Sequence, residues 1–85
     1  MIENGEREEQ RMRYTIKFIW DADAAVWIAT SDDVPGLVLE SGSFDALVER
    51  VKLAVPELVA LNGQKAPDFR LAYITEREDQ VAAYG

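Results

Sequence analysis

The segment from Trp20 to Gly36, WDADAAVWIATSDDVPG, constrains the fold more than any other part of the chain. A polar stretch at Asp21–Ala24 separates two stretches rich in β-branched and aromatic residues, which is the pattern of a β-hairpin. Pro35-Gly36 then matches a type II turn, since Pro presets φ at the second position and Gly accepts a positive φ at the third. The segment predicts two antiparallel strands followed by a tight turn, and it contains no catalytic motif.

The predicted hairpin carries bulky apolar side chains on both faces. In the first strand, 14–20, alternation separates Thr15, Lys17 and Ile19 from the set Tyr14, Ile16, Phe18 and Trp20. The second strand is predicted over 25–31, and two registers stay open. An even-length loop pairs Phe18 with Trp27, whereas a one-residue bulge pairs Phe18 with Ile28 and exchanges the faces. In either register, one helix can cover only one of the two faces.

The apolar spacing after Ser43 predicts one long amphipathic helix. Ser43 is the expected N-cap, and Asp45 lies in the first turn, where the helix dipole favours a negative charge. Pro56 interrupts the backbone hydrogen bonds, but the apolar phase continues across it, so we expect one kinked helix. Asn62-Gly63 is expected to end the helix with a left-handed cap. The side chains of the predicted helix core are Phe44, Leu47, Val48, Val51, Ala54, Val55, Leu58 and Val59.

Two further strands, 37–40 and 68–74, complete the order β-β-β-α-β. A right-handed crossover places the fourth strand beside the first and parallel to it, with sheet order 3-2-1-4. The prediction is an α+β domain over residues 14–74, with the helix on one face of the sheet. Residues 1–13 are charged and almost without apolar side chains, so we expect either disorder or a mis-assigned start, because Met12 immediately precedes the first strand. The polar tail, 75–85, could form a short helix, a partner-binding arm or a disordered segment.

Composition restricts the chemistry available to the chain. Its 85 residues include no Cys and no His, and the net charge is −7. The lack of Cys excludes disulfides and Cys-type zinc sites, and the lack of His removes the commonest general base and metal ligand. An acidic surface repels phosphate backbones, so we expect no nucleic-acid binding by this chain alone and favour a basic protein partner. No pattern of a signal peptide or membrane span is present, which predicts a cytoplasmic location.

Asp32 and Asp33 are the only adjacent carboxylates near a predicted turn, and they could form a metal or acid–base site. Adjacent Asp residues before a turn more often accept hydrogen bonds from backbone N–H groups. We therefore assign Asp32, Asp33, Pro35 and Gly36 to a structural turn. The sequence predicts no catalytic residue, no cofactor and no metal site, and hence no enzyme.

The second apolar face of the hairpin predicts self-association. One helix leaves that face uncovered, and the outer strands leave edges with unpaired backbone groups. A homodimer or higher oligomer would cover them, because a two-fold axis brings one patch onto its own copy. The candidate interface residues are Ile19, Trp20 and Trp27, since aromatic residues dominate interface hot spots. Packing in the core of the sheet is an equal alternative for Trp20, and for Trp27 it is the favoured interpretation.

Several ordered features together resemble a bacterial family: Trp20-Asp21, Trp27, the segment 32–37 and the segment 56–63. Over about residues 14–63 they resemble short members of the HicB-like antitoxin superfamily, specifically the DUF1902 family. The resemblance implies a partial ribonuclease-H-like fold that oligomerises. In full HicB antitoxins this domain covers the active site of a small RNA-cleaving toxin, and a separate segment binds the operator. The residues after the fourth strand are too few for such a segment, so we expect no operator binding by this chain.

The leading hypothesis is a non-catalytic, homo-oligomeric protein-interaction module, with an antitoxin that binds a small basic toxin as the role that the resemblance implies. One alternative is a metal-dependent nuclease on the ribonuclease-H-like fold. It is disfavoured because the first strand has no acidic residue mid-strand, and Asp68 and Glu49 alone do not make a two-metal site. The other alternative is a stand-alone oligomeric regulator.

Overall fold

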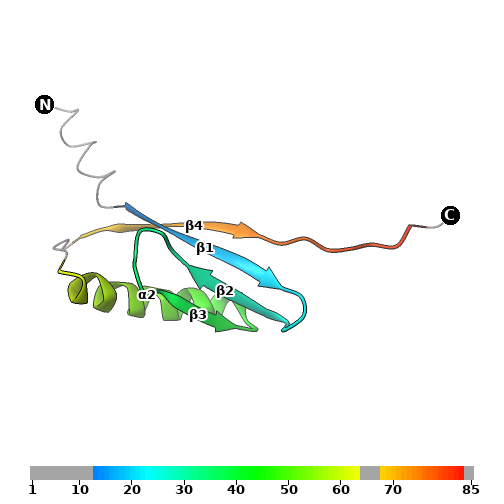
Figure 1. The fold of residues 1–85 in the computed structure, drawn as a ribbon, viewed down its shortest axis with the longest axis horizontal. Helices are drawn as coiled ribbons and strands as arrows, with labels where there is room; N and C mark the ends of the chain where they lie inside the picture. The colour runs from blue at the N-terminus through cyan, green and yellow to red at the C-terminus, as the bar shows by residue number, and fades with distance from the viewer. Residues whose placement is uncertain (1–12, 64–67, 84–85) are drawn as a thin grey trace, which may run out of the picture.

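A computed structural model describes residues 13–63 and 68–83. Within them the elements are β1 (Arg13–Asp21), β2 (Val26–Thr30), β3 (Val38–Ser41), α2 (Phe44–Leu61) and β4 (Arg70–Glu76). The strands form one sheet in the order β3-β2-β1-β4, with β1 antiparallel to β2 and parallel to β4. Helix α2 packs on one face of this sheet (Figure 1). The predicted α+β class, element order and sheet order are confirmed.

The strand boundaries differ from the predictions by one residue at each end of β1, β2 and β3, and by two residues at each end of β4. Arg13, which was assigned to the N-terminal extension, is the first residue of β1, and the prediction for residues 1–12 lies outside the described residues. Strand β4 begins at Arg70 and continues to Glu76, two residues into the predicted tail. The described part of the tail, 77–83, is not helical. It runs on from β4 as an extended segment (Figure 1).

The loop between β1 and β2 has the predicted length of four residues but begins one residue later than predicted, so both predicted pairings of Phe18 are wrong. Phe18 lies opposite Ala29, because residues 22–25 form a four-residue connection. The Oδ1 atom of Asp21 accepts hydrogen bonds from the backbone N–H groups two and three residues later, at 3.1 and 3.2 Å, and Ala25 adopts a φ of 56°. The loop still has an even length, so Trp27 lies on the same face as Phe18, as in the first of the two predicted registers.

The Pro-Gly turn has the predicted geometry. The backbone N–H of Leu37 donates to the carbonyl of Val34 at 3.2 Å, and Gly36 has a φ of 90°. These are the features of a type II turn, in which the third position needs a positive φ. The side chain of Asn62 donates from Nδ2 to the carbonyl of Pro35 at 3.3 Å, which ties the end of α2 to this turn.

Helix α2 begins and ends as the sequence predicts. The hydroxyl of Ser43 accepts a hydrogen bond from the backbone N–H of Ala46 at 3.2 Å, which is N-capping geometry. The helix continues through Pro56 to Leu61, and Gly63 follows with a φ of 77°. Among residues 13–63 and 68–83, no helix is both long and apolar enough to cross a membrane.

The core lies between α2 and the face of the sheet that carries Ile16 and Phe18. Both of these side chains are fully buried, and Phe18 packs against Phe44 of the helix at a ring-centroid distance of 4.9 Å. Burial of each large apolar side chain stabilises the fold by about 1.5–3 kcal/mol. The α2 residues that are buried in this core are Leu47, Val51, Val55 and Val59, and those packed partly buried against it are Phe44, Val48, Ala54 and Leu58.

Candidate interaction surface

The face of the sheet opposite α2, called the open face below, combines apolar and polar side chains. Ile19 lies opposite Ile28 at its centre, and Ile74 of β4 lies beside Lys17 of β1. Ile19 is 37% exposed and Ile74 is 54% exposed. The Nζ atom of Lys17 lies 3.8 Å from Oε1 of Glu76, so an ion pair crosses the face. The second apolar face that the sequence predicts is therefore present, but charged side chains interrupt it.

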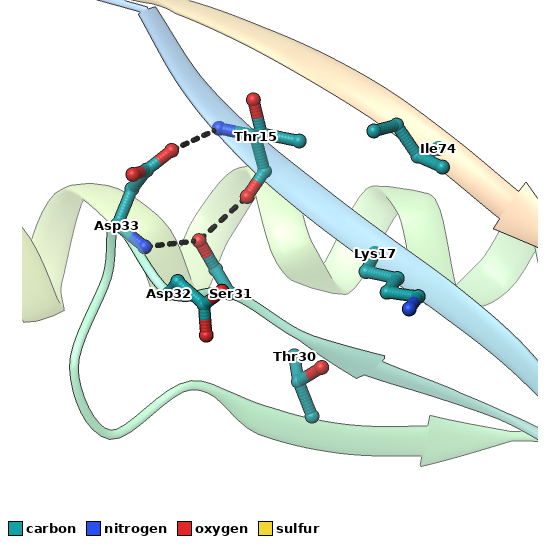
Figure 2. A pocket seen from close by; sticks show the side chains of 7 residues that line it. All are labelled: Thr15, Lys17, Thr30, Ser31, Asp32, Asp33 and Ile74. Atoms are coloured by element: carbon teal, nitrogen blue, oxygen red, sulfur yellow. Dashed lines mark hydrogen bonds between the residues drawn. The ribbon is translucent and has the colours of Figure 1, made fainter.

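One end of the open face is hollowed into a groove of about 290 Å³, lined by Thr15, Lys17, Ile74 and the segment 30–33 (Figure 2). Strand β2 ends here at Thr30, and the chain turns away from β1. At this point Thr15 of β1 loses its neighbouring strand on that side. Its two backbone groups bond instead to side chains of the loop that follows β2, as Figure 2 shows.

Ser31 and Asp33 provide these bonds. The backbone N–H of Thr15 donates to Oδ2 of Asp33 at 2.7 Å, and the Ser31 hydroxyl donates to the carbonyl of Thr15 at 2.6 Å. The Ser31 hydroxyl also accepts a hydrogen bond from the backbone N–H of Asp33 at 3.0 Å. Two side chains thus continue the backbone pairing of β1 after β2 has ended, which satisfies donor and acceptor groups that would otherwise lack a protein partner.

The hydrogen bonds at the groove give Asp33 a structural role. Its carboxylate is bound to the backbone of β1, while Asp32 is exposed at the rim of the groove (Figure 2). In the described part of the chain, no group of three or more acidic, His or Cys side chains could hold a metal ion. The groove therefore offers a few polar groups and the side chain of Ile74 as a contact surface.

An aromatic cluster lies on the other face of the sheet, at the end of β1. Trp20 and Trp27 lie opposite each other with ring centroids 5.4 Å apart, and Trp27 contacts Phe44 at 5.2 Å. Both indoles are half-buried. Trp27 belongs to the packing around the core, whereas Trp20 lies further out. Because Trp20 and Ile19 occupy opposite faces, the candidate interface residues do not form one continuous patch.

Arg77 covers part of this cluster, and the sequence reasoning missed it. Its guanidinium carbon lies 4.4 Å from the ring centroid of Trp20 and 5.9 Å from that of Trp27, distances typical of cation–π contacts. The signal was the alternation along β4. Ile19 pairs with Glu76, so the next residue, Arg77, falls on the face of Trp20. Because the strand is predicted to end at residue 74, the sequence assigns Arg77 to no face of the sheet.

The two edges of the sheet differ in how they are protected. Strand β3 is short, and the guanidinium of Arg50 on α2 donates from Nη1 to the carbonyl of Glu40 at 2.8 Å. A charged side chain thus occupies a backbone acceptor of this edge strand. Strand β4 has seven residues, and no described strand lies on its outer side. Its central five residues, 71–75, are uncharged.

Helix α2 leaves β4 largely uncovered as well. The helix packs against β2 and β3, and β4 lies at the edge of the sheet away from the helix (Figure 1). Tyr73 faces the helix side of the sheet and contacts Phe18 at 5.4 Å, but it remains 40% exposed. A long edge strand with an uncharged centre that is exposed on both faces is a template for pairing with another chain.

Comparison with known proteins gives a family but no function. The chain matches the family model of a domain of unknown function, DUF1902, over residues 13–84. It is similar to the crystal structure of the hypothetical protein TTHA1013 from the extremely thermophilic bacterium Thermus thermophilus, with 32% sequence identity and a TM-score of 0.64. That similarity covers 84% of this chain and 99% of the other. No protein of curated function matches the chain significantly.

Proposed function

The chain belongs to the DUF1902 family, and we propose that it is a non-catalytic protein-interaction module that works as a homo-oligomer. The observation that carries the proposal is the incomplete cover of the sheet. Helix α2 covers one face over β2 and β3, which leaves Ile19 and Ile74 exposed on the open face and β4 exposed at its edge. Association with another chain removes such a surface from water.

A more specific role follows from the resemblance to HicB-like antitoxins. In this role the homo-oligomer binds a small basic RNA-cleaving toxin and covers its active site, in the cytoplasm. The net charge of −7 supports this choice of partner, because a strongly acidic chain attracts a basic protein and repels nucleic acid. The open face, with Glu40 and Glu76 beside its isoleucines, combines the apolar and acidic groups that such a partner would contact.

The two alternative functions, a metal-dependent nuclease and a stand-alone oligomeric regulator, require different features of the chain. A metal-dependent nuclease needs a group of carboxylates, and the described residues contain no such group of three or more. Asp33 in particular is bound to the backbone of Thr15. A stand-alone oligomeric regulator would share the self-association but bind no toxin.

Light scattering and affinity capture test the proposal together. Light scattering on the purified chain over roughly 1–100 μM, the range in which moderate interfaces form, should give a multiple of the 9.6 kDa chain mass. A 9.6 kDa monomer at the highest concentration would refute homo-oligomerisation. Capture from the native host, followed by intact-mass analysis, then separates the roles. A small basic protein in fixed stoichiometry supports the antitoxin, and an oligomer without a partner supports the regulator.

A further inference from the structure

The two edges of the sheet differ in how accessible they are for backbone pairing, and this difference indicates which edge two copies can share. The β3 edge is short, and Arg50 occupies the carbonyl of Glu40. The β4 edge is longer, is uncharged over residues 71–75 and has no described strand beside it. Residues on both of its faces are exposed, Tyr73 on the helix side and Ile74 on the open face. Edge pairing between copies is therefore open at β4 and obstructed at β3.

We infer that two copies pair through their β4 strands, antiparallel and about a two-fold axis at Tyr73. This inference rests on the proposed homo-oligomerisation and names its surface. A two-fold axis perpendicular to the sheet makes β4 antiparallel to its copy and keeps both α2 helices on the same side. Residues directly opposite each other must then lie on the same face. Because faces alternate at every residue, the axis must pass at a residue and not between two residues.

Among the registers that satisfy this condition, the one centred on Tyr73 pairs the whole strand, because Tyr73 is the middle residue of Arg70–Glu76. An axis at Ala72 would leave Thr75 and Glu76 unpaired, and an axis at Ile74 would leave the first two residues unpaired. The Tyr73 register also places Arg70 opposite Glu76 of the second copy, twice in the dimer. Opposite charges at facing positions of an antiparallel pair stabilise it.

The arrangement covers the apolar surface that α2 leaves exposed beside β4. Leu71 and Tyr73 lie on the helix side, where Tyr73 already contacts Phe18. In the dimer Tyr73 lies opposite Tyr73 of the second copy and Leu71 lies opposite Thr75, so the helix-side surfaces of the two β4 strands shield each other. The two sheets become one continuous sheet. Its open face stays accessible in both copies and remains the surface for a different protein partner.

Cysteine cross-linking tests the edge and the register, because the chain has no Cys of its own. Tyr73→Cys places two thiols directly opposite each other, with Cα atoms about 4.5–5.5 Å apart, within the range that a disulfide spans. Ile74→Cys is the register control, since its copy lies diagonally at roughly 7–8 Å. Val38→Cys, on the 70% exposed side chain of β3, is the control for the other edge. Mild oxidation should link Tyr73→Cys into a covalent dimer fastest of the three.

A charge exchange tests the same register without touching the core. Arg70→Glu places like charges at both crossings and should weaken the dimer roughly tenfold. Adding Glu76→Arg restores opposite charges and should recover the dimer. If the wild-type chain is a dimer, but the Cys variants do not cross-link preferentially at position 73 and the charge exchange leaves the dimer unchanged, the β4 register is overturned while homo-oligomerisation stands. A wild-type chain that is monomeric throughout would refute homo-oligomerisation itself.

Discussion

Replacing Val51 by Ala tests whether the helix presents its apolar residues to the sheet as described. Val51 lies at the middle of α2 and is fully buried, with 0% of its surface exposed. The substitution removes two methyl groups at about 0.8 kcal/mol each in lost burial. It also leaves a cavity, which costs about 24 cal/mol per Å³ that the neighbours fail to fill. The better helix propensity of Ala offsets up to roughly 0.7 kcal/mol.

Together these three terms lower the free energy of unfolding by about 1–3 kcal/mol. Urea denaturation followed by Trp fluorescence measures it, at one fixed protein concentration because an oligomer's stability depends on concentration. Lys52→Ala is the matched control on the next residue. Lys52 is exposed, and its bond to Glu49 at 3.1 Å is a surface ion pair, so the expected loss is under about 0.5 kcal/mol. Equal losses for the two variants would refute the assigned helix face.

Three further predictions concern the turns and the absence of catalysis. Gly36→Ala should cost about 1–2 kcal/mol in urea denaturation, because φ is +90° at Gly36, while the new Cβ would meet Leu58 at only ordinary contact distance, 3.5 Å. A cost no larger than that of Gly42→Ala, a glycine without a positive φ, would contradict the strain argument. Asp33→Ala should speed hydrogen exchange at the Thr15 amide and destabilise the fold by about 1–2 kcal/mol, and an unchanged exchange rate would show that the 2.7 Å bond contributes nothing. The purified chain should cleave neither RNA nor DNA with Mg²⁺ or Mn²⁺, and cleavage that Asp32→Asn abolishes would contradict the non-catalytic assignment.

The sequence predicted some features of the candidate surface but not the contacts between residues distant in the chain. The sequence located Ile19 on a second apolar face and placed Asp33 in a turn, because strand alternation and turn chemistry are local properties. It did not show that Asp33 binds Thr15, a residue 18 positions earlier in the chain. It also grouped Ile19 with Trp20 as interface candidates, although adjacent residues of a strand point to opposite faces of the sheet.

Patterns within a few residues were sufficient to determine the elements of this protein and their order. The capping by Ser43, the type II turn at Gly36 and the apolar stripe of α2 each depend on near neighbours, so the sequence alone specifies them. The tertiary structure decided the hairpin register, the extension of β4 to Glu76 and the contact of Arg77 with Trp20. Ala25 adopts a φ of 56°, which costs a residue with a Cβ about 1–2 kcal/mol, so its local preference alone does not predict this conformation. Likewise, β4 extends beyond residue 74 because β1 provides backbone partners there, and the last of these pairs joins Ile19 and Glu76.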